Sequence, residues 1–272
     1  MNFASQPLVR GLRQPAADLA ACLRFYTRLP VPPLPFETAA FAMPDFSRIV
    51  RMLPLAGAVV GALAALVLGL AMVAGLPPMI AATLALTAMV LATGAMHEDG
   101  LADCADGFGG GAHLARKLEI MKDSRIGTFG GVVLVLSLLL RVLALGTLAG
   151  HGFWRAALVL VASAGISRAL GLLPLVLLLP ARAEGAGFAA GRPSPGALKL
   201  AAGLALALAL LPLLAGVPVR AVLAGGFWAG LLAYGMARLA KAQIGGQTGD
   251  VAGAAQQVAE IGFLLGIVAA AG

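Results

Sequence analysis

The chain has 272 residues, of which 60% are hydrophobic and 11% are charged, with 19 Lys and Arg against 12 Asp and Glu. About a quarter of the residues of a soluble domain are charged, so this chain cannot cover a water-facing surface. The mean hydropathy of +0.96 agrees. These values exclude a soluble enzyme, a disordered protein and an ordinary nucleic-acid binder. The net charge of +7 therefore points to membrane topology and lipid contact, with no nucleic acid expected.

Residues 1–52 are expected to form a cytoplasmic segment with one helix at the membrane surface, over 16–28. The apolar run from Leu19 to Leu29 is interrupted by Arg24 and Arg28, and no cleavage-site pattern follows it. A surface helix is therefore a better interpretation than a signal peptide.

Seven stretches are apolar and long enough to cross about 30 Å of hydrocarbon as helices. They are 53–75, 78–96, 129–149, 153–180, 197–217, 219–239 and 253–271. This predicts one all-α domain over 1–272, a polytopic integral membrane helix bundle. Gly171 and Pro174 predict a kink or break in the fourth stretch. The seventh stretch carries Gln256, Gln257 and Glu260 in its first half, so six spans plus a polar helix is an alternative.

Lys and Arg residues predict the orientation, because the cytoplasmic loops of membrane proteins are enriched in them. Fifteen of these residues fall in alternate segments that begin with the N-terminus, and only Arg155 and Arg220 fall on the opposite side. The N-terminus is therefore expected in the cytoplasm and, with seven spans, the C-terminus outside. The outer connections are very short, so the chemistry is expected at the cytoplasmic face.

Half of the acidic residues lie in 98–123, within a predicted cytoplasmic loop over 97–128. Asp99, Asp103 and Asp106 are spaced i, i+4, i+7 and share one face if this segment is helical. Three carboxylates on one face repel each other, and Mg²⁺ is a hard cation that binds carboxylates together with substrate phosphates. His97 adjoins them and is a candidate acid or base. The alternative is a solvated acidic loop.

A second motif, 119–127, combines basic and acidic side chains. Lys122 and Arg125 are three residues apart and could both reach phosphate, while Glu119 and Asp123 could add metal ligands. An interfacial helix with basic anchors is an alternative that is compatible with this role.

A third motif, Gly245–Asp250, places glycines directly before the last span. Such a loop can offer backbone N–H groups to an anion, and Asp250 could cap the helix or bind metal. The alternative is an ordinary turn with a cap.

Two cations, Arg141 and Arg168, fall inside predicted spans, each roughly 18 Å from the cytoplasmic end at 1.5 Å per residue. Charges at that depth are costly and are usually functional or paired. They could line a cavity for an anionic group, or they could pair with an acid such as Glu260.

These motifs together resemble the cobalamin synthase family, the adenosylcobinamide-GDP ribazoletransferases. The resemblance rests on matches in the same order along most of the chain: residues 25–32 (FYTRLPVP), 97–107, 118–127, Ser167-Arg168, Glu184-Gly185 and 245–250. One departure is Glu98, where the family usually has an apolar residue, often Leu.

The resemblance implies a multi-pass inner-membrane enzyme of the phosphotransferase class, from bacteria or archaea, that requires Mg²⁺. The donor would be adenosylcobinamide-GDP and the acceptor α-ribazole or its 5′-phosphate, giving adenosylcobalamin, or its 5′-phosphate, and GMP.

Four side chains are expected to be catalytic: Asp99, Asp103, Asp106 and His97. Whether an aspartate or His97 takes the acceptor's proton stays open. The expected metal ligands are Asp99, Asp103, Asp106, Asp123 and Asp250. The expected substrate-binding residues are Lys122, Ser124, Arg125, Arg168, Gly246, Gln247 and Thr248.

Two other functions are alternatives. The Asp-Gly-x-Ala stretch resembles part of the CDP-alcohol phosphotransferase motif, although the later part of that motif is not matched. A membrane ion transporter is less favoured, because transporters usually place their sites near the bilayer midplane. The oligomeric state is open, with a homo-oligomer as one outcome.

Overall fold

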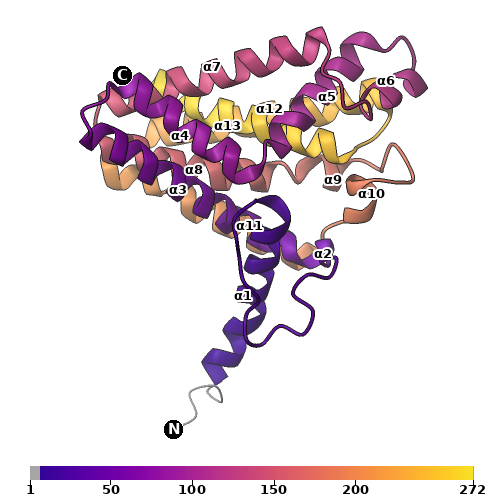
Figure 1. Ribbon diagram of the computed structural model, residues 1–272, viewed down its shortest axis with the longest axis horizontal. Coiled ribbons are helices and arrows are strands. Elements are labelled where there is room, and N and C mark those ends of the chain that lie inside the picture. The colour runs from indigo at the N-terminus through magenta and orange to yellow at the C-terminus, as the bar shows by residue number, and fades with distance from the viewer. Residues whose placement is uncertain (1–6, 272) are drawn as a thin grey trace.

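The structure, a computed structural model, describes residues 7–271, without the side chains of 7–12, 186 and 190. In chain order the helices are α1 (Pro7–Tyr26), α2 (Phe46–Ile49), η2 (Val50–Met52), α3 (Leu53–Val73), α4 (Pro78–Thr93), α5 (Met96–Gly110), α6 (Leu114–Ile120), α7 (Thr128–Gly150), α8 (Phe153–Leu170), α9 (Leu173–Leu177), α10 (Ala186–Ala190), α11 (Pro195–Ala209), η3 (Leu211–Ala215), α12 (Val219–Ile244) and α13 (Gly249–Ala271). Within these residues, extended pairing is limited to one isolated bridge between Pro180 and Gln247. The predicted all-α bundle is confirmed (Figure 1).

Six helical segments of the described chain are long and apolar enough to cross a membrane. They are Phe46–Val73, Thr128–Gly150, Phe153–Leu177, Pro195–Ala215, Val219–Ile244 and Gly249–Ala271. The last of these carries polar residues in its first half, which makes it the weakest of the seven expected spans. It is nevertheless a central helix, with Gln256, Gln257 and Glu260 buried against neighbouring helices instead of facing lipid. The expected break in the fourth span is also present, since α8 ends at Leu170 and α9 carries Pro174 in its first turn.

The span count depends instead on α4 and α5, which meet at an angle of 88°. Gly94 and Ala95 both have left-handed backbone conformations there, with φ of 64° and 60°, and a side chain at Gly94 would collide with Arg28. Met79 of α4 packs on Gly146 near the end of α7, while Asp106 of α5 lies against the start of α7. The bent pair therefore follows nearly the whole length of α7, which supports counting it as the seventh span.

The segment 97–128, expected as a loop, is mostly helical. Leu101, Ala102 and Cys104 of α5 are buried, and α5 packs against α7 and α13. The aspartates spaced i, i+4, i+7 therefore do lie on a helix, and this helix is part of the bundle.

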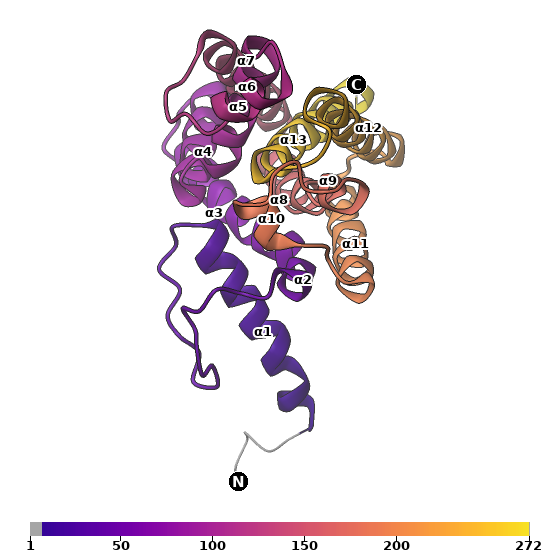
Figure 2. The same ribbon diagram turned by 90° about the vertical axis from the view of Figure 1, so that its right-hand side faces the viewer.

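Helix α1 projects from the bundle, with its N-terminal end clear of the other helices (Figures 1 and 2). It includes most of the expected helix at 16–28 and begins earlier. Its attachment is Asp18, which is 1% exposed and pairs with Arg51 at 2.7 Å and Arg48 at 3.3 Å. This anchor holds the end of α1, and with it Phe25 and Tyr26, against the bundle.

Candidate functional site

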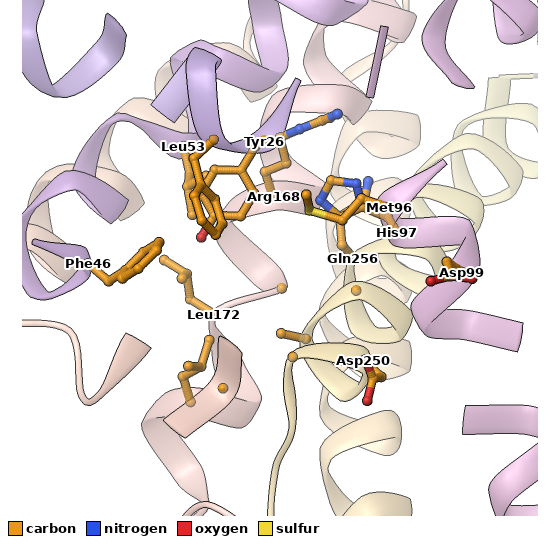
Figure 3. A pocket seen from close by; sticks show the side chains of 17 residues that line it. Tyr26, Phe46, Leu53, Met96, His97, Asp99, Arg168, Leu172, Asp250 and Gln256 are labelled. Carbon is orange, nitrogen blue, oxygen red and sulfur yellow. The ribbon is translucent and has the colours of Figure 1, made fainter. Parts of the chain in front are cut away.

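A cavity of about 250 Å³ opens where the ends of α1 and α5 meet α8, α9 and α13. It is lined by Phe25, Tyr26, Phe46, Leu53, Met96, His97, Asp99, Arg168, Gly171, Leu172, Leu175, Gly187, Gly249, Asp250, Ala252, Gly253 and Gln256. Figure 3 shows Asp99 and Asp250 on one side of it, and Phe46, Leu53 and Leu172 on the other. The cavity therefore has a carboxylate end and an apolar end.

Asp99 and Asp250 reach the cavity from two helices in close contact. A Cβ atom at Gly100 of α5 would lie 2.8 Å from the carbonyl oxygen of Asp250, so glycine is what permits this approach. The Asp250 carboxylate accepts a hydrogen bond from the Thr248 hydroxyl at 3.1 Å and pairs with Arg182 at 3.3 Å.

Asp106 has a different environment from Asp99, although both belong to the predicted aspartate face of α5. Its carboxylate is buried and accepts backbone N–H bonds from Gly127 at 2.7 Å and Gly130 at 2.8 Å. These donors belong to the start of α7, where the helix dipole favours a negative charge. Asp103 is half-buried between the two.

Asp99, Asp103 and Asp106 therefore do not form a preformed cage of three carboxylates. In the part of the chain that the structure describes, no group of three or more His, Cys, Asp or Glu side chains is arranged to hold a metal ion. The acidic side chains that share the cavity wall are Asp99 and Asp250.

Lys122 and Arg125, the predicted phosphate-binding residues, are both exposed and ion-paired. Lys122 pairs with Glu184, and this hydrogen bond lowers the pKa of Glu184. Arg125 pairs with Asp123 at 2.6 Å, and its hydrogen bonds lower the pKa of Asp123 to about 2. Arg125, Asp123 and Asp106 line a second hollow of about 480 Å³; Ser124 is exposed beside it.

The structure does not bring Gly246, Gln247 and Thr248, expected to bind substrate, to the cavity wall. Gly246 packs on the backbone of Leu179, Gln247 donates to the carbonyl of Gly187 at 3.1 Å, and the Thr248 hydroxyl accepts from the N–H of Val251 as a cap for α13. All three are buried. The turn-with-cap alternative therefore describes their contacts, and the following residues, Gly249 and Asp250, face the cavity.

His97 and Arg168 do line the cavity, as their predicted roles require. His97 is buried and stacks on Tyr26, with ring centroids 6.5 Å apart. Arg168 is 4% exposed and donates to the carbonyl of Ala164 at 2.9 Å.

Arg141 is ion-paired with acidic side chains, which confirms for this residue the alternative of pairing with an acid such as Glu260. Its guanidinium lies 3.0 Å from Glu98 and 3.5 Å from Glu260. Gln257 also donates to Glu98 at 3.2 Å, and Gln256 donates to Glu260 at 2.8 Å. Glu98 is therefore a partner in a buried charge network.

Two features of this region are not recognisable in the sequence motifs. Arg182 reaches Asp250, and its Nη1 atom is buried without a hydrogen-bond partner in the structure. Phe25 and Tyr26 form part of the wall although they lie far from the acidic motif in sequence. Phe25 and Tyr26 belong to a stretch that carries the family resemblance, 25–32, which is the signal the sequence offers for them. Arg182 lies outside the stretches that carry this resemblance, two positions before Glu184-Gly185.

Comparison with known proteins gives a consistent result. The sequence profile of the cobalamin-5-phosphate synthase family matches residues 18–268. A relative named adenosylcobinamide-GDP ribazoletransferase from Azorhizobium caulinodans is 51% identical over 253 residues, covering 93% of this chain and 95% of the relative. Relatives of the same name from Xanthobacter autotrophicus and Mesorhizobium japonicum are 52% and 43% identical, each over 93% of this chain and over 96% and 93% of their own. No solved structure matches.

Proposed function

This chain belongs to the cobalamin-5-phosphate synthase family, and from that premise we propose that it is an adenosylcobinamide-GDP ribazoletransferase. It transfers the adenosylcobinamide phosphate group to α-ribazole, or to α-ribazole 5′-phosphate, and releases GMP. The observation that carries the assignment is the match over nearly the whole chain to relatives of this name. A cavity with two carboxylates and an arginine in its wall agrees with it.

The reaction is a displacement at phosphorus. The acceptor hydroxyl oxygen forms a bond to the phosphorus that carries cobinamide, the bond from that phosphorus to the GMP oxygen breaks, and the hydroxyl proton passes to a base. Such a transfer needs positioning and charge neutralisation more than covalent catalysis. The protein therefore has to hold a diphosphate beside a hydroxyl and a proton acceptor.

The residues divide these tasks. Arg168, in the cavity wall, and Arg182, the partner of Asp250, neutralise phosphate oxygens. Lys122 and Arg125 add positive charge at the protein surface once they leave Glu184 and Asp123.

We assign the proton acceptor to an acid or to the histidine of α5. Asp103, Asp99 or His97 takes the acceptor proton. Asp106 instead positions the start of α7 against α5 through its two backbone hydrogen bonds.

Mg²⁺ suits the carboxylate end in one specific way. Proteins usually bind Mg²⁺ by one or two carboxylates together with substrate phosphates and water, and not by an all-protein cage. Asp99 and Asp250 would provide such a pair, Asp103 is the next acid on the same face of α5, and diphosphate oxygens would complete the ligand set. Bound there, the ion would neutralise the charge of the diphosphate.

Turnover by the purified protein tests the assignment. Protein in detergent or liposomes is given adenosylcobinamide-GDP, α-ribazole and Mg²⁺, and GMP and cobalamin are measured by mass spectrometry. We expect both products, and loss of both when EDTA replaces Mg²⁺. Absence of turnover across metals and lipids would exclude the transferase, while CMP released from a CDP-alcohol would favour a CDP-alcohol phosphotransferase.

The substitution Asp103→Asn tests the role of a carboxylate in this site, because it replaces one carboxylate oxygen by an amide nitrogen and leaves the side chain otherwise unchanged. We expect turnover to fall at least about 100-fold, because an amide neither binds Mg²⁺ as a carboxylate does nor accepts a proton. The matched control is Glu119→Gln, since Glu119 is exposed on α6 and pairs with Arg116. Near-normal turnover by the Asp103→Asn protein would show that Asp103 neither binds the metal nor accepts the proton.

A further inference from the structure

We propose that the apolar end of the cavity holds the aromatic base of the acceptor nucleoside, and that Phe46 is the residue that selects it. This proposal rests on the proposed transferase function, because that function defines which groups must enter the site. It assigns the two ends of one cavity to two different parts of the reactants.

The size of the cavity limits what enters it. Its volume of about 250 Å³ lies below the roughly 300–1,000 Å³ typical of pockets that enclose drug-sized ligands. A corrinoid macrocycle is larger than such ligands, so it stays outside. Only a nucleoside-sized portion of a reactant fits, and two nucleosides compete for the place: the guanosine of the donor and the ribazole acceptor.

The apolar side chains of the cavity wall favour the base of one of these two nucleosides over the other. Phe25, Phe46, Leu53, Leu172 and Leu175 line the cavity, and Figure 3 shows Phe46, Leu53 and Leu172 at its apolar end. These side chains carry no hydrogen-bonding groups, whereas Tyr26 beside them contributes a single hydroxyl. Guanine has an amide and an amino group, which lose their water partners when buried without replacement. The dimethylbenzimidazole of a ribazole presents methyl groups at its outer edge, so burial of that edge costs no hydrogen bonds.

Three aromatic side chains also meet in the cavity wall. The ring centroids of Phe25 and Phe46 lie 4.7 Å apart at 76°, and those of Phe25 and Tyr26 lie 4.8 Å apart at 74°. An aromatic guest can make edge-to-face or offset-stacked contacts with such rings in addition to burying its surface, and an aliphatic guest of equal size cannot. Phe46 lies on the side of the cavity opposite Asp99 and Asp250 in Figure 3.

This placement orients the rest of the acceptor. Figure 3 shows His97, Arg168 and Gln256 between the two ends of the cavity. With the base against Phe46, the ribose would lie beside these three side chains and the reacting hydroxyl would point to the carboxylate end. The hydroxyl thus reaches the carboxylate end, where the donor diphosphate is to be held. The reverse orientation would put the hydroxyl among phenylalanine and leucine side chains.

The experiment compares Phe46→Ala and Phe46→Leu with wild-type protein and with Phe41→Ala. Phe41 is 78% exposed on the nearby loop and does not line this cavity. For each protein, KM is measured separately for α-ribazole and for adenosylcobinamide-GDP, and binding of α-ribazole alone is measured by calorimetry. Thermal unfolding confirms that each variant is folded, and Phe46→Leu keeps an apolar side chain in case Phe46→Ala unfolds.

We expect Phe46→Ala to raise the KM and Kd for α-ribazole roughly tenfold, Phe46→Leu to raise them less, and Phe41→Ala to change neither. The KM for the donor should stay within about twofold in all of them. A rise in donor KM alone would place guanosine at this end and overturn the proposal, as would unchanged constants in folded Phe46→Ala protein. Binding of α-ribazole that depends on Phe46 in a protein without turnover would support the base site and contradict the transferase.

Discussion

At the scale of single residues, the buried charges set the strictest conditions on the chain. Arg141 and Glu260 are 1% and 0% exposed, and each would be costly alone in a membrane-embedded bundle. Together with Glu98 and Arg168 they balance in charge, two acids against two bases. Substitutions in this network should therefore differ widely in how much they lower the stability of the protein.

Arg141→Met should destabilise the protein by about 3–5 kcal/mol, because it removes the guanidinium that ion-pairs with both Glu98 and Glu260. Glu98→Leu should cost far less, since Glu260 still pairs with Arg141 at 3.5 Å. Thermal unfolding in detergent measures both. Equal losses in the two variants would contradict the view that Glu260 is sufficient as a partner.

Arg182 is a candidate phosphate ligand, since one of its guanidinium nitrogens is buried without a hydrogen-bond partner and another pairs with Asp250 of the cavity wall. Arg182→Ala should lower kcat/KM for the donor about 10- to 100-fold, and Arg182→Lys should recover only part of it, because lysine cannot bind phosphate with a planar fork. Arg192, exposed in the same connection, provides the control Arg192→Ala. An unchanged donor constant in Arg182→Ala protein would exclude phosphate binding by this residue.

At the scale of elements, α1 connects the N-terminal segment to the site. Asp18 fixes it to α2 and η2. Arg24 fixes the loop after it, with bonds to Glu37 at 2.8 and 3.0 Å and to the carbonyls of Val31, Pro32 and Ala40. The hydrogen bonds from Arg24 lower the pKa of Glu37. Two polar anchors thus hold the aromatic wall of the cavity in place.

Asp18→Ala should loosen this attachment more than Arg51→Ala, and Arg51→Ala more than Arg48→Ala. The order follows from burial, since the side chains of Asp18, Arg51 and Arg48 are 2%, 21% and 47% exposed, and loss of a buried partner leaves the other charge unpaired. Limited trypsin cleavage at the exposed Arg28 reports on the loop. A different order of cleavage rates would show that Asp18 is not the principal anchor.

At the scale of the whole molecule, the distribution of Lys and Arg makes the orientation testable. With α4 and α5 counted as one span, a reporter fused after Gly150 should appear outside, and reporters fused after Ala112 or Gly191 should appear inside. Paired alkaline phosphatase and fluorescent-protein fusions measure this. A reporter after Ala112 that appears outside would mean that α4 and α5 form a re-entrant element, with six spans in total.

Much of this architecture could be predicted from local sequence. Hydropathy located the spans, because a helix in lipid must be apolar along about 20 residues. Arg141 and Glu260 could be matched as partners because an isolated buried charge needs one. The contacts of Asp106 with the start of α7, and of Arg182 with Asp250, could not be predicted in this way, since they join segments that are separate in sequence and depend on how the helices pack.

The turn between α4 and α5 escapes prediction for a different reason. Gly94 is a usual residue for a left-handed helix end, but Ala95 is not, and no sequence rule anticipates a second left-handed residue directly after the first. The close approach of Arg28 to Gly94 shows that tertiary packing contributes to this turn.

The buried network has a consequence for the order in which the protein is assembled. A chain is made from its N-terminus, so Glu98 is synthesised 43 positions before Arg141, whereas Glu260 follows much later. Glu98 is therefore already in the chain when Arg141 is made. The guanidinium of Arg141 can be neutralised by Glu98 before α13, which carries Glu260, is synthesised.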